Sequence, residues 1–471
     1  MNVNLSATGT WRIDNSDQQY YGDLYLNKDE GGIVLYIRIP NSGPIMSYLE
    51  LPLTIPFITG STANGAEITL VDCARISTES RIGSEEVFGY QAKFMLDGAN
   101  FEKEEDISFS KMTISIPGII QWGDVSNYVR PELEDRETLI GLKIIEPIEI
   151  YSCEDYTLSY DLTFSSPFEM MKEEINLKQT PYLVIEAHSV QKLEWFMQIA
   201  NQIKRLIEIA MGFPLGFNSM VVESPEIYYE FEDDKKHIRP LEVLHAFKQN
   251  ISKENNTKRM LKHDFLFNLS ELRHANFPKW QEISTIMEPI IELYIDSLYN
   301  RKLSVNRHFL NMVQALETYH SRRIAYSLRD YKKRVEQLLE VRPEASRKQD
   351  EKFLLDGCRD FVTLRCRLAD LLLADHSFIF HTGDFKFTEF PQIVANTRNY
   401  YTHYNQNQEH KALKGEELIT AFHILRNILE FYLLKEFGFE EEFIHDRIRE
   451  RISPIMTSNE IKKADKQKRY K

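Results

Sequence analysis

The hydrophobic pattern of this chain changes its period once, near Ser189, and that change limits the folds available to it. Upstream, short alternating or β-branched runs recur between turn sequences, as in Gln19–Asn27 and Gly32–Pro40. Downstream, apolar residues recur at steps of three and four positions, beginning with Leu193–Ala210, which is the spacing of an amphipathic helix. The pattern predicts an α+β protein in which an antiparallel β-rich domain, sandwich-like or barrel-like, precedes the helices.

This change of period divides the chain into four segments. We expect a β-rich N-terminal domain over residues 1–188 and its helical extension over 189–300, with one further strand at Ile227–Phe231. An all-helical bundle follows over 301–455. The tail, residues 456–471, is basic, and it either contacts RNA or is a solvated terminus.

The helical part shows several separate amphipathic stretches. Pro289 is expected to kink or divide the first of them, Ile283–Leu298. The bundle helices are expected at Val305–Arg323, Arg329–Val341, Glu351–Leu373, Phe390–Tyr401 and Lys414–Phe437.

Composition limits the partners and the compartment. Lys and Arg total 57 against 71 Asp and Glu, a net charge of -14, so any nucleic-acid site must be local. The N-terminus lacks the pattern of a signal peptide, and no apolar run approaches the roughly 18 residues of a membrane helix. Four widely spaced cysteines favour a reducing cytoplasm over a disulfide scaffold. We therefore expect a cytoplasmic protein without a membrane partner.

The stretch Pro391–His410 carries the most suggestive chemistry, because four residues separate Arg398 from His403. Arginine binds phosphate oxygens bidentately and keeps its charge. Histidine transfers protons near neutral pH. Together they suit metal-independent cleavage of RNA by the ribose 2′-OH, which gives a 2′,3′-cyclic phosphate and a 5′-OH. Arg398 and His403 are therefore candidate catalytic residues, and the reaction that they suit would need no cofactor.

Spacing alone does not single out this pair, since Arg239/His245 and Arg301/His308 match it as well. Arg239 precedes Pro240, unlike a residue of a catalytic helix, and Arg301/His308 lies at a helix entry with a mixed face. We interpret both of these pairs as structural.

The neighbours of Arg398 and His403 supply candidate accessory groups. Asn399 lies four residues before His403 and shares its helix face. Glu317 either faces the motif and holds an Arg or His, or is an exposed helix carboxylate. Tyr400, Tyr401 and Tyr404 are candidates for stacking on RNA bases, with at least one of them expected in the core. One Arg and one His make a small active site, which favours two copies joined about a two-fold axis.

Four residues close together in the sequence form a candidate zinc site. Cys358, Cys366, His376 and His381 are suitable ligand types. Their spacing matches no compact zinc motif, and buried thiols with incidental histidines explain them better, so no metal site is predicted.

Three segments in this order resemble the HEPN domain of ApeA-like proteins: VQALETYH, FPQIVANTRNYYTHYN and LKGEELITAFHILRNILEFYLLKEFGF. The resemblance is strongest over about residues 301–440. Upstream, the β-rich region and PYLVIEAHSVQKLEWFMQIANQIKRLIEIAMGFP resemble the ApeA N-terminal domain. By this resemblance, Arg398 and His403 match the family's Arg-x4-6-His ribonuclease motif, and Asn399 matches the polar residue that often follows the Arg.

The resemblance also implies a function. It implies a helical bundle that dimerises to form a composite cleft, a metal-independent endoribonuclease activity with tRNA anticodon loops as target, and a role in abortive anti-phage defence. The N-terminal region would then sense a trigger such as a phage protein, or restrain the nuclease. The alternative is a non-catalytic dimer that binds RNA or protein and whose β domain recognises a phage or host ligand.

Overall fold

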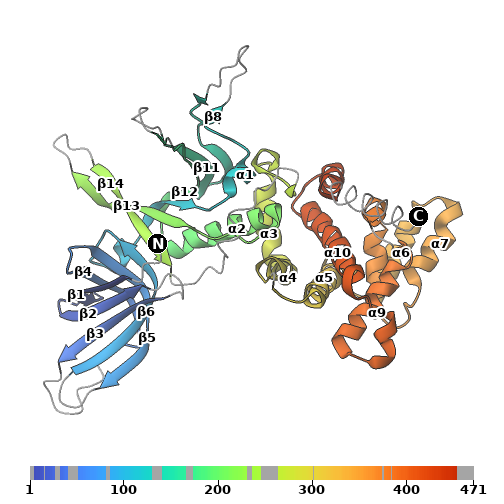
Figure 1. Ribbon diagram of the computed structural model, residues 1–471, viewed down its shortest axis with the longest axis horizontal. Coiled ribbons are helices and arrows are strands. Elements are labelled where there is room, and N and C mark those ends of the chain that lie inside the picture. Colours follow the sequence, from blue (N-terminus) through green and yellow to red (C-terminus); the bar gives the residue numbers. More distant parts are fainter. Residues whose placement is uncertain are drawn as a thin grey trace. The chain divides into compact units, whose positions relative to one another are not determined.

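The chain folds into two compact units, which the computed structural model in Figure 1 shows. The first comprises Met1–Lys204 and Leu215–Lys258, and the second Arg205–Pro214 and Arg259–Lys471. Helix α2 (Leu193–Met211) contributes residues to both. The structure describes residues 5–14, 16–26, 32–40, 51–80, 85–129, 140–165, 173–174, 176–230, 236–245, 264–300, 302–373, 376–382 and 385–452. The predicted basic tail, 456–471, and Arg301 lie outside these described residues.

Six strands of the first unit close into a barrel. Their order is β6-β3-β2-β1-β4-β5, and β5 pairs back onto β6, with every pairing antiparallel. The strands are β1 (Leu5–Ile13), β2 (Gln19–Leu26), β3 (Ile33–Pro40), β4 (Thr54–Thr62), β5 (Glu67–Ser80) and β6 (Glu85–Asp97). The predicted antiparallel β-rich domain is thus confirmed, in its barrel-like form.

Trp11 anchors the core of this barrel. Its ring is fully buried, and its indole N–H donates a hydrogen bond to the carbonyl of Gly22 at 3.2 Å. A Cβ added at Gly60 would lie 2.4 Å from the Trp11 ring and 2.5 Å from the carbonyl oxygen of Thr10. Glycine at position 60 therefore lets the neighbouring strand approach the indole closely.

A second run of strands continues from β6. β14 (Lys236–His245) pairs with the end of β6, and the order continues β14-β13-β7-β12-β11-β10, all antiparallel. The other members are β7 (Phe109–Ser115), β10 (Ile148–Ser152), β11 (Tyr156–Phe164), β12 (Gln179–Gln191) and β13 (Ser219–Glu230). The short helix α1 (Ile119–Gly123) and a separate two-stranded ribbon, β8 (Tyr128–Val129) with β9 (Gly141–Leu142), lie between β7 and β10 in the chain.

The strand predicted at Ile227–Phe231 is confirmed as far as Glu230, where it forms the end of a longer strand, β13, but the second strand of this region, β14, was not predicted. Their outer halves are largely exposed. An exposed strand needs no apolar alternation, so its sequence resembles that of a polar loop. The pairing of both strands with β7 and β6 is a tertiary feature.

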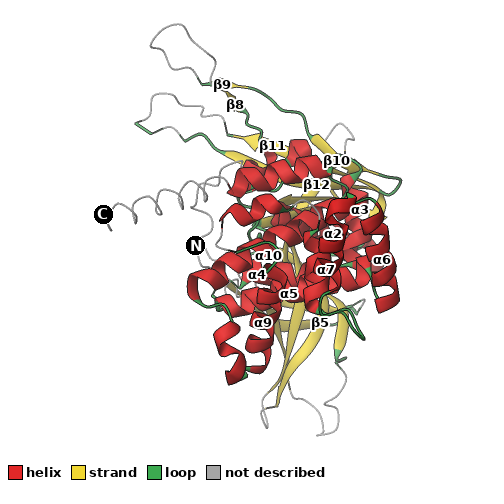
Figure 2. Cartoon of the chain, turned by 90° about the vertical axis from the view of Figure 1, so that its right-hand side faces the viewer, coloured by secondary structure: helices red, strands yellow, loops and turns green. Residues whose placement is uncertain are grey.

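The second unit is helical, as predicted for the C-terminal part, and α5 lies at its centre. Figures 1 and 2 show α5 beside α4 and α10, and it also contacts α8 and α9. The helices are α3 (Asn276–Ile286), α4 (Glu288–Tyr299), α5 (Val305–Tyr319), α6 (Leu328–Glu340), α7 (Glu344–Leu355), α8 (Leu364–Leu372), α9 (Phe390–His403) and α10 (Gly415–Glu436). Pro289 stands in the first turn of α4, so the predicted division at this proline is confirmed.

Two helix predictions need correction. The helix predicted over Glu351–Leu373 is two helices, α7 and α8, because Gly357 between them has φ 78°, a left-handed conformation that stops a helix. The helix predicted over Val305–Arg323 is α-helical only to Tyr319. It continues as a π-helical segment, His320–Ile324.

Within the described part of the chain, no helix is both long and apolar enough to cross a membrane.

Candidate active site

Helix α9 holds the predicted motif rigidly at its C-terminal end. Pro391 occupies its first turn, and Val394, Ala395 and Thr397 are buried. The Thr397 hydroxyl donates to the carbonyl of Ile393 at 2.8 Å and accepts from the backbone N–H of Leu413 at 3.1 Å. These contacts fix the position of the helix and, with it, the last turn that carries Arg398 and His403.

The helix ends immediately after His403. Tyr404 adopts a left-handed conformation, φ 49°, and its N–H donates to the carbonyl of Tyr400 at 2.6 Å. This is the usual way to end a helix, although glycine is commoner at the position. His403 is thus the last residue of α9 and is exposed.

Glu317 and Arg398 meet across two helices. The Arg398 guanidinium lies 3.8 Å from the carboxylate of Glu317, on α5, and 3.4 Å from the side-chain oxygen of Asn399. Both charged side chains are about one-third exposed, 36% and 35%. Of the two readings of Glu317, contact with the motif is the one realised in the structure.

His403 points elsewhere. It lies five positions after Arg398, so their side chains leave the helix about 140° apart. Thr402, four positions after Arg398, donates its hydroxyl to the carbonyl of Arg398 at 2.8 Å and shares its face. No described residue forms a hydrogen bond or an ion pair with His403. Within one chain, the two predicted catalytic side chains are therefore on different faces of α9.

The three predicted stacking tyrosines form one cluster at the end of α9. Tyr400 lies 5.1 Å from Tyr401 and 5.7 Å from Tyr404 between ring centroids. Tyr401 donates its hydroxyl to the carbonyl of Leu413 at 3.0 Å, and burial raises its pKa. Tyr404 is 61% exposed. The expectation that one of them belongs to the core was wrong, because Tyr400 and Tyr401 are only half-buried.

Arg398 borders a surface pocket of about 600 Å³ between α5, α8 and α9. Its lining residues come from these helices and from the segment after α5; they are Leu310, Val313, Gln314, Glu317, Thr318, Ser321, Arg322, Tyr326, Arg367, Arg398 and Thr402. Three of them are arginines and one is a carboxylate. We did not predict Arg322, Arg367 or Tyr326 from the sequence, although the basic pair Arg322-Arg323, one residue after VQALETYH, was a visible signal.

The other Arg/His pairs lie in different surroundings. Arg239 lies 3.5 Å from Glu67, and His245 packs on Phe94 with ring centroids 4.8 Å apart. Burial lowers the pKa of His245. His308 packs on Phe422 at 5.7 Å, and its partner Arg301 lies outside the described residues.

The four zinc-type residues are spread over different environments. Cys366 is buried on α8, and Cys358 lies in the link before it. His376 is buried against Phe431, with ring centroids 4.6 Å apart, and the side chain of His381 is outside the described ones. Among the described residues, no group of three or more His, Cys, Asp or Glu side chains is arranged to hold a metal ion.

A β-rich unit with a closed barrel thus precedes a helical unit that carries Arg398 and His403 on one helix. Two family models match: ApeA N-terminal domain 1 over residues 6–280, and Apea-like HEPN over residues 310–443. The chain therefore belongs to the ApeA-like HEPN proteins. This family is one of anti-phage HEPN nucleases, and HEPN domains typically dimerise and bind RNA. No curated protein and no solved structure matches the chain.

Proposed function

We propose that this chain is a metal-independent endoribonuclease that cleaves tRNA, in its anticodon loop, during abortive anti-phage defence. Its active form is a homodimer with a composite active site. The HEPN match supports the nuclease class, and the arginine-rich pocket beside Arg398 supports an anionic substrate.

The observation that carries this proposal is the placement of Arg398 and His403 on α9. Arg398 lines the pocket, whereas His403 is exposed at the helix end about 140° away. One copy leaves the two side chains on different faces. A second copy related by a two-fold axis can place its own His403 beside Arg398, because such an axis repeats each contact reciprocally.

The chemistry follows from the two side chains. His403 takes the proton of the ribose 2′-OH as the 2′-oxygen forms its bond to phosphorus. The bond from phosphorus to the 5′-oxygen breaks, and the departing 5′-oxygen takes a proton from water. Arg398 stabilises the negative charge that builds up on the phosphoryl oxygens. The products are a 2′,3′-cyclic phosphate and a 5′-OH.

The remaining motif residues take accessory roles in this proposal. Glu317 and Asn399 hold the Arg398 guanidinium, which they contact at 3.8 and 3.4 Å. Tyr400, Tyr401 and Tyr404 offer aromatic edges and faces to unpaired bases, with Tyr404 the most exposed of the described three.

The proposal assigns control to the N-terminal region. Residues 1–188 and their extension, 189–300, sense a trigger such as a phage protein or restrain the nuclease, which occupies residues 301–455. A toxic ribonuclease in the cytoplasm must be held inactive in healthy cells. The net charge of -14 disfavours binding to bulk RNA at rest.

The test is cleavage of total tRNA in EDTA by the wild type, Arg398→Ala and His403→Ala. Matched controls are Arg329→Ala and His410→Ala, which replace exposed residues outside the motif and pocket. We expect the wild type and both controls to produce discrete fragments that end in a cyclic phosphate, and Arg398→Ala and His403→Ala to produce none. The assay is repeated with extract from phage-infected cells, because the proposed control by the N-terminal region requires a trigger.

The alternative outcomes are distinct. Cutting that EDTA abolishes, or fragments with a 3′-OH, would contradict the mechanism. Toxicity in cells that survives His403→Ala would favour the non-catalytic binding protein.

A further inference from the structure

The pocket beside Arg398 carries more positive charge than its neighbours neutralise. Of its three arginines, Arg398 alone has a carboxylate partner within ion-pair distance among the described residues, and that partner is Glu317. Neither Arg322 nor Arg367 forms an ion pair with any residue that the structure describes. The lining therefore retains two formal positive charges, in a concave site of about 600 Å³.

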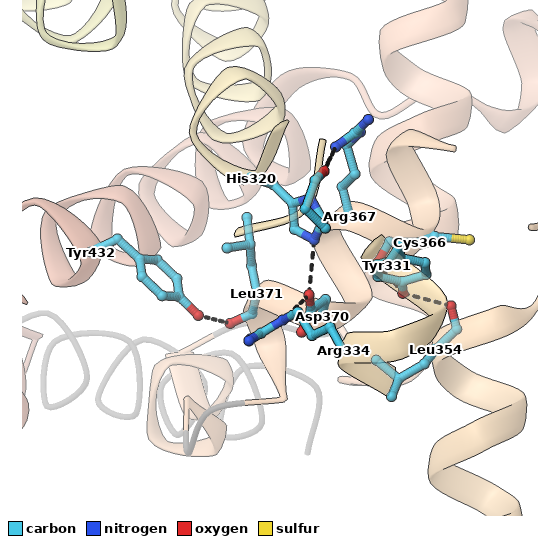
Figure 3. Close-up of polar contacts among 10 residues, drawn as sticks. His320, Tyr331, Arg334, Leu354, Cys366, Arg367, Asp370, Leu371 and Tyr432 are labelled. Atoms are coloured by element: carbon cyan, nitrogen blue, oxygen red, sulfur yellow. Dashed lines mark hydrogen bonds and ion pairs between the residues drawn. The ribbon is translucent and has the colours of Figure 1, made fainter. Parts of the chain in front are cut away.

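Arg367 is held in place by neutral groups. Its guanidinium contacts the Nδ1 atom of His320 at 3.0 Å and donates to the carbonyl of Ala325 at 3.1 Å (Figure 3). Because a guanidinium only donates, His320 Nδ1 must accept, and the ring is neutral with its proton on Nε2. Burial lowers the pKa of His320, and it lowers the pKa of Arg367 more than the charge of Glu317 raises it.

The carboxylate behind His320 does not neutralise Arg367. Asp370 is fully buried and accepts from His320 Nε2 at 2.9 Å and from Arg334 at 2.7 Å (Figure 3). Asp370 thus pairs with Arg334 and fixes the His320 tautomer, and His320 in turn orients Arg367. An arginine positioned this precisely and left without an anion is suited to binding an anion from outside.

The backbone at the pocket wall is also unusual. His320–Ile324 is π-helical, closed by the Ala325 N–H donating to the His320 carbonyl at 2.9 Å. π-Helical segments are rare and occur frequently at functional sites. Here the segment directs His320 into the core while Ser321 and Arg322 line the pocket.

An exposed aromatic ring completes the site. Tyr326 lines the same pocket and is 82% exposed. A large aromatic ring that remains in water next to unneutralised arginines has the features of a nucleotide site, in which a base stacks and a phosphate is bound by charge.

We infer that the pocket is an RNA subsite: Arg322 and Arg367 bind a backbone phosphate, Tyr326 stacks on the adjoining base, and His320 is the positioning residue for Arg367. This inference rests on the proposed function for its ligand, single-stranded RNA, and adds residues outside the Arg398/His403 motif.

The test measures RNA binding without cleavage. The full-length His403→Ala protein is titrated against a fluorescent short single-stranded RNA, alone and with Arg322→Gln or Arg367→Gln added. Each substitution should weaken binding about tenfold and reduce the dependence of affinity on salt, since each removes about one phosphate contact. Arg329→Gln, an exposed arginine on α6 outside the pocket, is the matched control and should change neither.

Further variants separate charge from stacking and from misfolding. Tyr326→Ala should weaken binding several-fold, whereas Tyr326→Phe should retain it, because the ring faces and not the hydroxyl stack on the base. Arg322 is exposed and forms no ion pair within the part of the chain that the structure describes, so Arg322→Gln should leave the thermal unfolding temperature unchanged.

Several results would overturn the inference. The first is that the His403→Ala protein does not bind RNA. The second is that adding Arg322→Gln or Arg367→Gln leaves its affinity for RNA unchanged. The third is that these substitutions weaken the binding of a nucleoside 5′-monophosphate but leave RNA binding unchanged. The last result would make the pocket a site for a free nucleotide. Arginine-dependent binding by a protein that never cleaves RNA would instead refute the ribonuclease proposal and leave the subsite standing.

Discussion

At the scale of single residues, the ion pair between Arg398 and Glu317 is weak, but it lies in the proposed RNA-binding pocket. The two groups are 3.8 Å apart and each about one-third exposed, and such pairs contribute about 0–1 kcal/mol to stability. Its significance lies in the pocket, where Glu317 is the one carboxylate among the lining residues.

Glu317→Gln should therefore separate binding from catalysis. Removing the carboxylate should tighten RNA binding by the His403→Ala protein about threefold, because the pocket becomes more positive. In the otherwise unchanged enzyme, kcat should fall, because Arg398 loses its orienting partner. Fluorescence anisotropy and tRNA cleavage measure the two effects, with Glu336→Gln on the exposed face of α6 as control. Weaker binding by Glu317→Gln would contradict this account.

Glu430 shows the opposite case, a charge whose role is structural. It is fully buried, and its carboxylate accepts from Tyr294 at 2.6 Å, Arg426 at 2.8 Å and Arg451 at 2.7 Å. Burial acts to raise the pKa of Glu430, but Arg451 and Arg426 outweigh it and hold the pKa at about 2.

Glu430→Gln should destabilise the helical unit by about 3–5 kcal/mol, because two arginines lose their buried anion. Urea unfolding measures the change, and Glu417→Gln, an exposed glutamate on α10, should have almost none. In the wild type, the contribution of Glu430 is present above about pH 4.5 and is lost as pH falls towards about 2. A Glu430→Gln protein as stable as the wild type would show that the site repacks around the amide.

At the scale of elements, His320 and Asp370 connect the π-helical segment to α6 and α8. His320 is surrounded by Asp370, Arg334 and Arg367, and its ring lies 5.7 Å from Tyr331. Protonation would place a third cation beside two arginines and break the contact from Arg367.

This arrangement predicts a loss of stability in mild acid. Because burial lowers the pKa of His320 in the folded state, the unfolded chain binds the proton first, and stability falls as pH drops below roughly 6.5. His308 and His423, whose pKa values burial also lowers, act in the same direction. The urea concentration at the midpoint of unfolding should therefore decrease when the pH is lowered from about 7.5 to about 5.5.

The variants for this prediction are His320→Gln and His410→Gln. The first should flatten the pH dependence in part, and the second, at an exposed histidine, should not change it. If stability depends on pH equally steeply in both variants, His320 is not a source of the pH dependence.

At the scale of the whole molecule, the proposed composite site makes a quantitative prediction. If each site combines Arg398 of one copy with His403 of the other, mixing the inactive Arg398→Ala and His403→Ala proteins restores one site in every mixed dimer. Random exchange of subunits should then give about a quarter of the wild-type cleavage rate. Two affinity tags demonstrate that mixed dimers have formed. If these dimers recover no cleavage activity, Arg398 and His403 of each active site belong to the same chain.

Local sequence patterns determined much of this protein. Helix α9 begins at Phe390, where the pattern predicts, and the change of period near Ser189 indicated the order of the β-rich and helical parts. The Arg398/His403 motif could be identified for the same reason, since both residues lie on one short segment. Helix and strand periods arise from interactions between near neighbours, so they can be read without knowledge of the fold.

The tertiary structure alone decided the contacts between distant segments. The exposed strands β13 and β14 became recognisable only through their pairing with β7 and β6. Arg367 and His320 are 47 residues apart, and nothing in either local sequence indicates that they meet. Packing places such residues together, because burying apolar faces brings whole helices into contact and carries their polar side chains along. The pocket that joins Arg398 to Arg322, Arg367 and Tyr326 is a product of that packing.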